Sequence, residues 1–270
     1  MSTVASGYWQ DLTAADLAAL DVDATVALLP VAAVEQHGPH LPLATDAAIS
    51  AGLVSRTLEL LRARGDTGPR LLVLPALDIG HSPEHAAVAG TLSAGAETLL
   101  ALWTDVAAGV AAAGVRRLVL LNSHGGQTAL MDLAAVRWRA HLRMQVVRAF
   151  WPAFGMPAGL FDTDEWRYGL HGGEVETSLM LHLAPQLVRM DAARDFTPAQ
   201  PDDGRGRLGF EGPVGLGWLC TDLHPAGVCG NAARADASRG AALLSHLAQV
   251  LLGIVDALAA LAPPAPAGRA

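Results

Sequence analysis

Short apolar runs alternate with longer helix-like segments over the first 150 residues. The apolar runs are rich in small and branched side chains, as is typical of strands buried on both faces of a sheet; they are residues 24–34, 70–78, 116–122 and 144–150. Ala- and Leu-rich stretches between the runs predict helices at residues 46–64, 93–114 and 127–142. This alternation predicts an α/β fold with a mostly parallel central sheet covered by helices on both faces.

The second half of the chain is less regular. A polar turn at 162–173 precedes a predicted short helix at 174–183, and residues 201–218 predict a long loop. The most apolar segment, 241–262, is interrupted by Ser245, His246, Gln249 and Asp256. A buried helix tolerates such residues, whereas a membrane span rarely contains them.

Composition narrows the kind of protein. With 270 residues, 51% of them hydrophobic, the chain can bury a sizeable core, and we expect one domain over 1–262 followed by a flexible Pro/Ala-rich tail at 263–270. A net charge of −8 argues against nucleic acid or an anionic membrane as a partner and favours a small-molecule or short-peptide substrate. Cys220 and Cys229 predict free thiols, and the N-terminus has no secretory pattern, so we expect a cytoplasmic protein.

Three polar clusters directly follow predicted strands, at residues 35–46, 78–85 and 122–127. Because ligands of parallel sheets lie beyond the carboxyl ends of the strands, we expect the clusters to meet at one edge. Glu35 and His37 are two positions apart, which places both side chains on the same side of an extended segment. Asp46 begins the next helix, where it is placed to cap that helix or to bridge two cations. His124 follows the third strand and precedes two glycines.

These residue types favour a metal site. Carboxylates with neutral imidazoles suit Zn²⁺, Mn²⁺ or Fe²⁺, and a pair of such ions would activate water for attack on a carbonyl. Taken singly, each residue also has a structural reading: Asp46 as a helix cap, and Glu174 and Glu176 as first-turn carboxylates that favour the helix dipole. The combined pattern makes the metal reading the stronger one.

Other candidates carry less weight. We expect supporting or loop roles for His40, His81 and His85, and structural or surface roles for the remaining histidines, which are His141, His182, His224 and His246. Ser123 does not stand in a GxSxG nucleophile elbow. The segment 204-GRGRLG-209 follows no predicted strand and is not a dinucleotide fingerprint.

Five segments together resemble the creatininase (creatinine amidohydrolase) family, in the expected order over most of the chain. They are PVAAVEQHGPHLPLATD, GHSPEH, NSHGGQ, HGGEVETS and GVCGNAARADASRG. The resemblance implies a three-layer α/β/α fold, two divalent metal ions and hydrolysis of amide-type C–N bonds in cyclic or small substrates. It also implies a homo-oligomer, often a hexamer.

The resemblance also implies roles for individual residues. The implied metal ligands are Glu35, His37, Asp46, His124 and Glu176, with Asp46 as the bridge. His171 is implied as the donor of a proton to the leaving nitrogen, and Glu174 as a catalytic carboxylate that is also the second choice as a ligand. Ser82 is implied as a substrate-binding residue.

The chain also departs from creatininase itself. Creatininase has a Tyr and a Glu after the metal-binding histidine, and the Glu completes its second metal site, whereas this chain has Gly125 and Gly126. The second ion therefore needs another carboxylate, with Glu176 as first choice. The aromatic residue that packs on the substrate ring in creatininase is replaced near Arg167, which argues against creatinine as the substrate, and we expect Arg167 to bind an anionic substrate group instead. The leading hypothesis is a metal-dependent amidohydrolase; the alternatives are a metallopeptidase or deformylase acting on a linear amide, and a non-catalytic small-molecule binding protein.

Overall fold

The structure is a computed structural model that describes residues 5–65, 68–197, 209–210 and 214–262. Within these residues one parallel sheet has the strand order β1-β3-β2-β4-β5. Its strands are β1 (Gly7–Tyr8), β2 (Thr25–Val31), β3 (Arg70–Val73), β4 (Arg117–Asn122) and β5 (Gln145–Phe150). The chain leaves β2 in one direction to form β3 and returns on its other side to form β4. The carboxyl ends of β2 and β4 thus flank a topological switch point, where ligands of such sheets bind.

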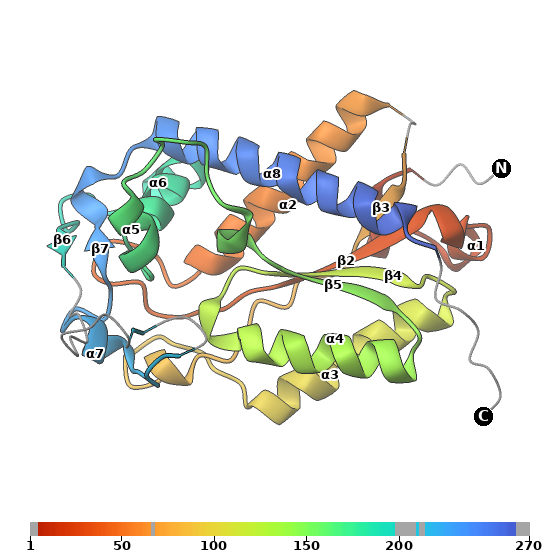
Figure 1. The fold of residues 1–270 in the computed structure, drawn as a ribbon, viewed down its shortest axis with the longest axis horizontal. Coiled ribbons are helices and arrows are strands. Elements are labelled where there is room, and N and C mark those ends of the chain that lie inside the picture. The colour runs from red at the N-terminus through yellow and green to blue at the C-terminus, as the bar shows by residue number, and fades with distance from the viewer. Residues whose placement is uncertain (1–4, 66–67, 198–208, 211–213, 263–270) are drawn as a thin grey trace.

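Helices cover both faces of the sheet (Figure 1). On one face lie α2 (Thr45–Arg64), α6 (Glu174–Leu183) and α8 (Ala237–Ala260), and on the other lie α3 (Ala96–Ala112) and α4 (Thr128–His141). Alternate residues of β2 serve the two cores: Val26 and Leu28 pack with the first group of helices, and Ala27 and Leu29 with the second. The predicted three-layer α/β/α fold is therefore confirmed.

The predicted long elements agree with the structure to within a few residues, apart from the strand predicted at 70–78. That strand stops at Val73, because Pro75 has no N–H to donate to the ladder. Pairing resumes at Leu77, whose N–H donates to the carbonyl of Pro30 over 3.0 Å. The turn predicted at 162–173 contains a helix, α5 (Thr163–Tyr168).

The sequence pattern did not predict several short elements, which are α1 (Ala14–Ala18), α7 (Cys220–Leu223) and the antiparallel pair β6 (Asp195–Phe196) and β7 (Gly230–Asn231). Elements this short leave no hydrophobic period to detect. Most of the predicted loop 201–218, and all of the tail 263–270, lie outside the described residues.

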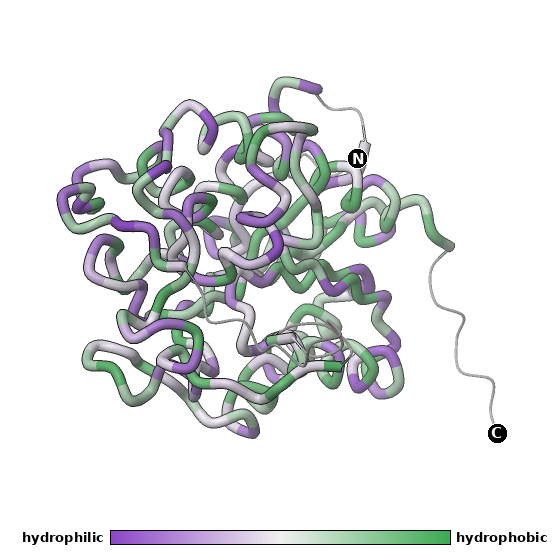
Figure 2. Tube along the Cα trace, turned by 60° about the vertical axis from the view of Figure 1, so that its left-hand side comes forward, coloured by the Kyte–Doolittle hydropathy of each residue, from purple (hydrophilic) through white to green (hydrophobic). Residues whose placement is uncertain are grey.

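Helix α8 is the one helix in the described part of the chain that is long and apolar enough to cross a membrane. Its side chains Leu243, Leu247 and Leu251 are buried in the same core cluster as α2 and α6. Figure 2 shows hydrophobic and hydrophilic residues mixed along most helices, as expected for helices with one side against a sheet. We therefore interpret α8 as a core helix.

Candidate metal and catalytic centre

The first metal-ligand group lies at the carboxyl ends of β2 and β4. Glu35 follows β2, His124 follows β4, and Asp46 lies in the first turn of α2; all three side chains are buried. Nδ1 of His124 is 3.1 Å from Oε1 of Glu35 and 3.5 Å from Oδ2 of Asp46. Because β2 and β4 are neighbours, residues 89 positions apart in the chain meet in one group of ligand atoms.

A second group shares Asp46 with the first. Oδ1 of Asp46, its other carboxylate oxygen, is 3.5 Å from Nε2 of His37, and this nitrogen is 3.9 Å from Oε2 of Glu176 at the start of α6. The two oxygens of Asp46 therefore face different histidines, as a carboxylate that bridges two ions would. The structure thus brings together the five residues predicted as ligands.

The buried ligand atoms fit a cation because they lack other partners. Within the described residues, both oxygens of Glu35, Nε2 of His37 and Oδ2 of Asp46 are buried without a hydrogen bond. Burying a charged or polar atom without compensation is costly, and a divalent ion would compensate all of them. Oxygen and imidazole donors are those that Zn²⁺, Mn²⁺ and Fe²⁺ prefer.

The same crowding shifts the pKa values of these groups. Burial alone would lower the pKa of His37, but Asp46 and Glu176 outweigh it and raise that pKa to about 9. Burial raises the pKa of Glu176 to about 7. For Asp46, the effect of burial is outweighed by His37 and His124, which lower its pKa to about 2. The pKa of His124 is also raised well above its usual value by Asp46 and Glu35, against the effect of burial, so without an ion the cluster holds its extra protons on His37 and His124.

Two residues of the 3₁₀ helix Pro83–His85 join the site. Oε1 of Glu84 is 3.3 Å from Nε2 of His124, and Nε2 of His85 is 3.5 Å from Oε1 of Glu35. The sequence analysis gave His85 only a supporting role and did not single out Glu84. Both residues belong to the segment GHSPEH, which follows a predicted strand, and this position was the sequence signal that they lie near the site.

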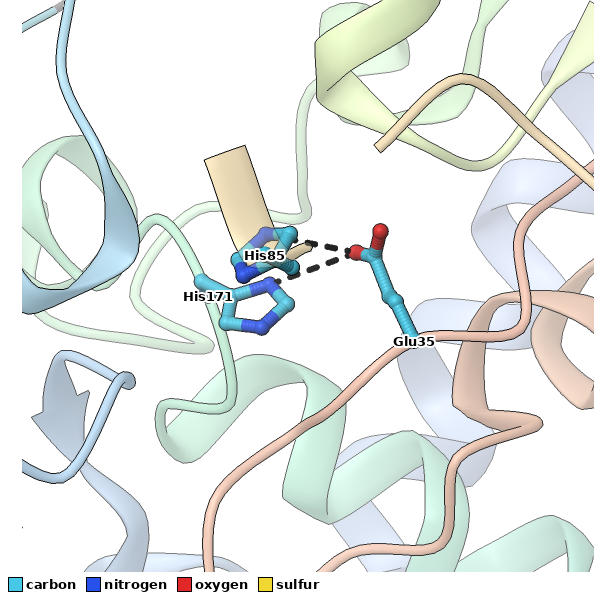
Figure 3. A group of neighbouring side chains, drawn as sticks. All are labelled: Glu35, His85 and His171. Carbon is cyan, nitrogen blue, oxygen red and sulfur yellow. Dashed lines mark ion pairs between the residues drawn. The ribbon is translucent and has the colours of Figure 1, made fainter. Parts of the chain in front are cut away.

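His171 approaches the same carboxylate from a third segment. Its Nδ1 is 3.8 Å from Oε1 of Glu35, and Figure 3 shows His171 and His85 turned toward this oxygen. Its Nε2 donates to the backbone carbonyl of Gln36 over 2.7 Å. Burial, followed by repulsion from His37 and His85, lowers the pKa of His171 well below its usual range, so its ring is neutral.

Glu165 holds the segment that carries His171. Its carboxylate accepts hydrogen bonds from the backbone N–H of Glu174 over 2.7 Å and of Asn231 over 2.8 Å. It lies so close to the backbone that a Cβ at Gly173 would collide with it. Burial is the main cause of its raised pKa. Glu165 thus joins α5, α6 and β7 behind the site.

The structure places two predicted residues away from the ligand cluster. The carboxylate of Glu174 is fully buried in an ion pair with the guanidinium of Arg239, and Arg234 lies 4.0 Å away. Glu174 is therefore turned from the ligands for which the sequence made it a second choice. The guanidinium of Arg167 lies 5.1 Å from the centre of the Tyr168 ring and does not line the cavity over the site.

The other predicted residues are placed as follows. Oγ of Ser82 is buried 3.2 Å from Nε2 of His124. His40 lies one layer out: its Nε2 donates to the carbonyl of Gly172 over 3.0 Å, which supports the predicted supporting role. Cys220 and Cys229 are both free, as predicted, and both are buried.

A cavity of about 380 Å³ opens above the ligand cluster. Its floor contains Glu35, Asp46, His124 and Glu176. Four aromatic side chains line its walls: Phe150, Trp151, Trp166 and Trp218. No lysine or arginine lines the cavity among the described residues, so negative charge in a ligand has no basic side chain to meet there.

A parallel sheet that gathers buried carboxylates and histidines at a switch point, under such a cavity, defines a metal-dependent hydrolase of the α/β class. The creatinine amidohydrolase family model matches residues 10–255. The chain belongs to the creatininase family.

Proteins of two activities are among its relatives. The mycofactocin precursor peptide peptidase of Mycobacterium ulcerans is 33% identical over 195 residues, which cover 70% of this chain and 72% of that protein. The creatinine amidohydrolase of Pseudomonas putida is 32% identical over 191 residues, 64% of this chain and 70% of that protein. These two relatives are a peptidase and an amidohydrolase.

Solved creatininase structures share the fold. A mutant creatininase of Zn-Zn type has a TM-score of 0.74 and 27% identity, covering 93% of this chain and 98% of that chain. A manganese creatininase has a TM-score of 0.73 with the same identity, covering 93% and 97%. Zinc and manganese are thus the ions of these neighbours.

Proposed function

We propose that this protein hydrolyses an amide C–N bond in a small molecule or short peptide, using two divalent metal ions bound at the base of the cavity. The observation that carries the proposal is the pair of buried ligand groups that share Asp46, one with His124 and Glu35 and the other with His37 and Glu176. Glu176 supplies a carboxylate on the side of His37. This carboxylate would replace the metal-binding Glu that the chain lacks at position 126.

Divalent ions at such a site supply Lewis-acid polarisation of a carbonyl and activation of water near neutral pH. The chain's own residues supply orientation and proton transfer. His171 is neutral and keeps its Nε2–H on the carbonyl of Gln36, which leaves Nδ1 free to accept a proton and pass it to the leaving nitrogen. The substrate contact at Ser82 stays a prediction, since its hydroxyl is buried against His124 and the residue does not line the cavity.

The aromatic walls favour a substrate with an apolar or aromatic group next to the amide. Trp151 and Trp166 lie edge to face with ring centres 6.5 Å apart, and both line the cavity. Their apolar surface would be buried against such a group, which stabilises binding by about 25 cal/mol per Å². The anionic substrate group proposed to face Arg167 finds no support in the placement of this side chain on Tyr168.

A substrate panel with defined metal tests the proposed function. Protein loaded with Zn²⁺, Mn²⁺ or Fe²⁺ is incubated with lactams, formamides and short peptides that carry aromatic side chains. We expect hydrolysis of at least one class, lost in Asp46→Asn and retained in His141→Gln, a surface variant on α4. Saturable binding of panel members without turnover under any metal would instead favour a non-catalytic binding protein.

Cellular context and assembly belong to the same proposal. We propose a cytoplasmic enzyme, supported by the two free buried cysteines, since a reducing compartment keeps thiols free. That the protein forms a homo-oligomer, and in particular a hexamer, stays a prediction. Light scattering tests it by measuring the mass of the native protein.

A further inference from the structure

The side-chain amide of Gln36 has only one orientation that satisfies its neighbours. Its Nε2 lies 2.6 Å from the carbonyl oxygen of Gly227, which can only accept a hydrogen bond. Its Oε1 lies 3.0 Å from the backbone N–H of Gly38, which can only donate. The amide nitrogen and oxygen are therefore assigned by two backbone groups, independently of any histidine.

This orientation fixes the tautomer of His85, and the backbone carbonyl of the same residue fixes the tautomer of His171. Nε2 of Gln36 is 2.9 Å from Nδ1 of His85; because the amide donates, Nδ1 accepts and the ring proton is on Nε2. The backbone carbonyl of Gln36 accepts from Nε2 of His171 over 2.7 Å, so the lone pair of His171 is on Nδ1. The 3.3 Å approach between Nε2 of Gln36 and Nε2 of His171 joins two donors and is no hydrogen bond.

The two rings consequently present opposite groups to the same place. Nε2–H of His85 lies 3.5 Å, and the Nδ1 lone pair of His171 lies 3.8 Å, from Oε1 of Glu35 (Figure 3). The rings are stacked with centroids 4.1 Å apart, and both line the cavity. A donor and an acceptor thus stand side by side above the first ligand group.

We propose that His85 is a catalytic residue that donates a hydrogen bond from Nε2 to the carbonyl oxygen of the substrate amide, and that Gln36 is the positioning residue that holds His85 and His171 in the Nε2–H tautomer with opposite ring atoms toward Glu35. This inference rests on the proposed function. His85 does not relay a proton, because its Nδ1 accepts a hydrogen bond from Gln36 and so cannot take up a proton to replace one lost from Nε2. A neutral imidazole can stabilise the negative charge that develops on a carbonyl oxygen in this way.

The proton moves through His171 instead. The water oxygen forms a bond to the carbonyl carbon, and the proton that it loses passes to Nδ1 of His171. This proton then passes to the leaving nitrogen as the C–N bond breaks, so that His171 ends the cycle neutral. His85 stabilises the charged oxygen between these two steps and exchanges no proton.

Nitrogen NMR of zinc-loaded protein with isotope-labelled histidine tests the tautomers without any turnover. We expect the His85 ring to show a protonated Nε2 and an acceptor-type Nδ1, in a signal that His85→Gln removes and that is separate from the His171 signal of the same type. In Gln36→Leu the His85 ring loses its fixed tautomer. A protonated Nδ1 on His85 in the wild-type protein would overturn the proposal.

Kinetics test the hydrogen bond itself. The amide nitrogen of Gln is placed like Nε2 of histidine and that of Asn like Nδ1, so His85→Gln keeps a donor where His85→Asn loses it. We expect His85→Asn to lower kcat by about 10²–10³ with little change in KM, as for the loss of one donor to a developing oxyanion. His85→Gln recovers at least tenfold of this loss, and zinc content stays unchanged in both. Equal activity of the two variants, or zinc loss in both, would contradict a direct hydrogen bond to the substrate.

The two levels of the proposal fail in different ways. If the wild-type protein hydrolyses no amide, the proposed function fails, whereas the NMR result still decides the tautomers that Gln36 imposes. If the wild-type protein is active and the His85 variants match it, the proposed function stands and the role of His85 is refuted. His141→Gln serves as the surface control in both experiments.

Discussion

The carboxylate of Glu84 occupies the space in which a side chain at position 126 would begin. A Cβ added to Gly126 would collide with Oε1 of Glu84 and would lie 2.7 Å from Nε2 of His124. Position 126 is also where creatininase carries its additional Glu. In this chain a carboxylate therefore reaches the same region from the 3₁₀ helix Pro83–His85, and the glycine makes room for it.

This relationship predicts that Gly126→Ala is harmful although it adds a single methyl group. The methyl displaces Glu84 from His124, and loss of such an outer contact to a metal-binding histidine lowers metal affinity by about 10–100-fold. Competition with a chelating indicator measures the effect. Gly125→Ala is the matched control, since the nearest atom to its added Cβ is 3.9 Å away, on Phe150.

The converse exchange is the sharper experiment. Glu84→Ala removes the carboxylate and leaves only the contact with Nε2 of His124, so Gly126→Glu should be tolerated better together with Glu84→Ala than alone. We expect the double variant to bind metal more tightly than either single variant. Purely additive losses would mean that Glu84 and Gly126 are not coupled.

The bridging position of Asp46 predicts unequal losses of metal. Because its two oxygens face His37 and His124 separately, Asp46→Asn weakens both ions, whereas Glu176→Gln affects the ion on the side of His37. Elemental analysis should therefore give about two ions per chain for the wild-type protein, about one for Glu176→Gln and less than one for Asp46→Asn. The same loss in both variants would argue against two separable ions.

The sequence predicted which candidate ligands lie together better than it predicted their surroundings. Glu35, His37 and Asp46 lie in one short connection after a buried strand, and the switch-point rule brings His124 to them, so pattern and topology were sufficient. The placements of Glu174 and Arg167 depend on partners far away in the chain or on rotamer choice, such as Arg239, 65 residues after Glu174. No local pattern contains that information.

The roles of Glu84 and His85 were hidden for a different reason. Their segment follows β3 through an irregular connection that begins at Pro75, so neither a helical nor a strand period fixes where their side chains point. The space left by Gly126 becomes visible only when the two loops are seen together. The sequence indicated that Glu84 and His85 lie in a polar cluster after a strand, but it did not predict where their side chains point.

The stability of the metal-free protein should fall as pH rises above about 6.5, where the lowered pKa values of His40, His85 and His171 no longer act in the opposite direction. The folded pKa of His37 is about 9, above its unfolded value of about 6.5, so its stabilising charge is fully present below about pH 6.5 and is lost toward pH 9. The folded pKa of Glu176 is about 7, also above its unfolded value, and acts in the same direction between about pH 4.5 and 7.

Zinc-loaded protein should show the opposite trend over this range. Metal binding requires deprotonated ligands, so apparent affinity rises as protons leave the histidines. Thermal unfolding of chelator-treated and zinc-loaded samples, at several pH values, measures both slopes. In His37→Gln the fall of the metal-free protein above about pH 7 should be shallower, and parallel curves for the two wild-type samples would refute the linkage.

Breaking the ion pair between Glu174 and Arg239 should lower the free energy of unfolding strongly and leave metal binding unchanged. The Glu174 carboxylate is fully buried, so Arg239→Leu leaves it without its main counter-charge, and breaking such a buried pair costs about 3–5 kcal/mol. We place the expected loss near the lower figure, because the Arg239 side chain is 26% exposed and Arg234 lies 4.0 Å from the same carboxylate. Arg239→Lys keeps the charge and should lose less. Urea unfolding measures the change, and metal content at low temperature should equal that of the wild-type protein; loss of metal in Arg239→Leu before unfolding would place Glu174 in the metal site after all.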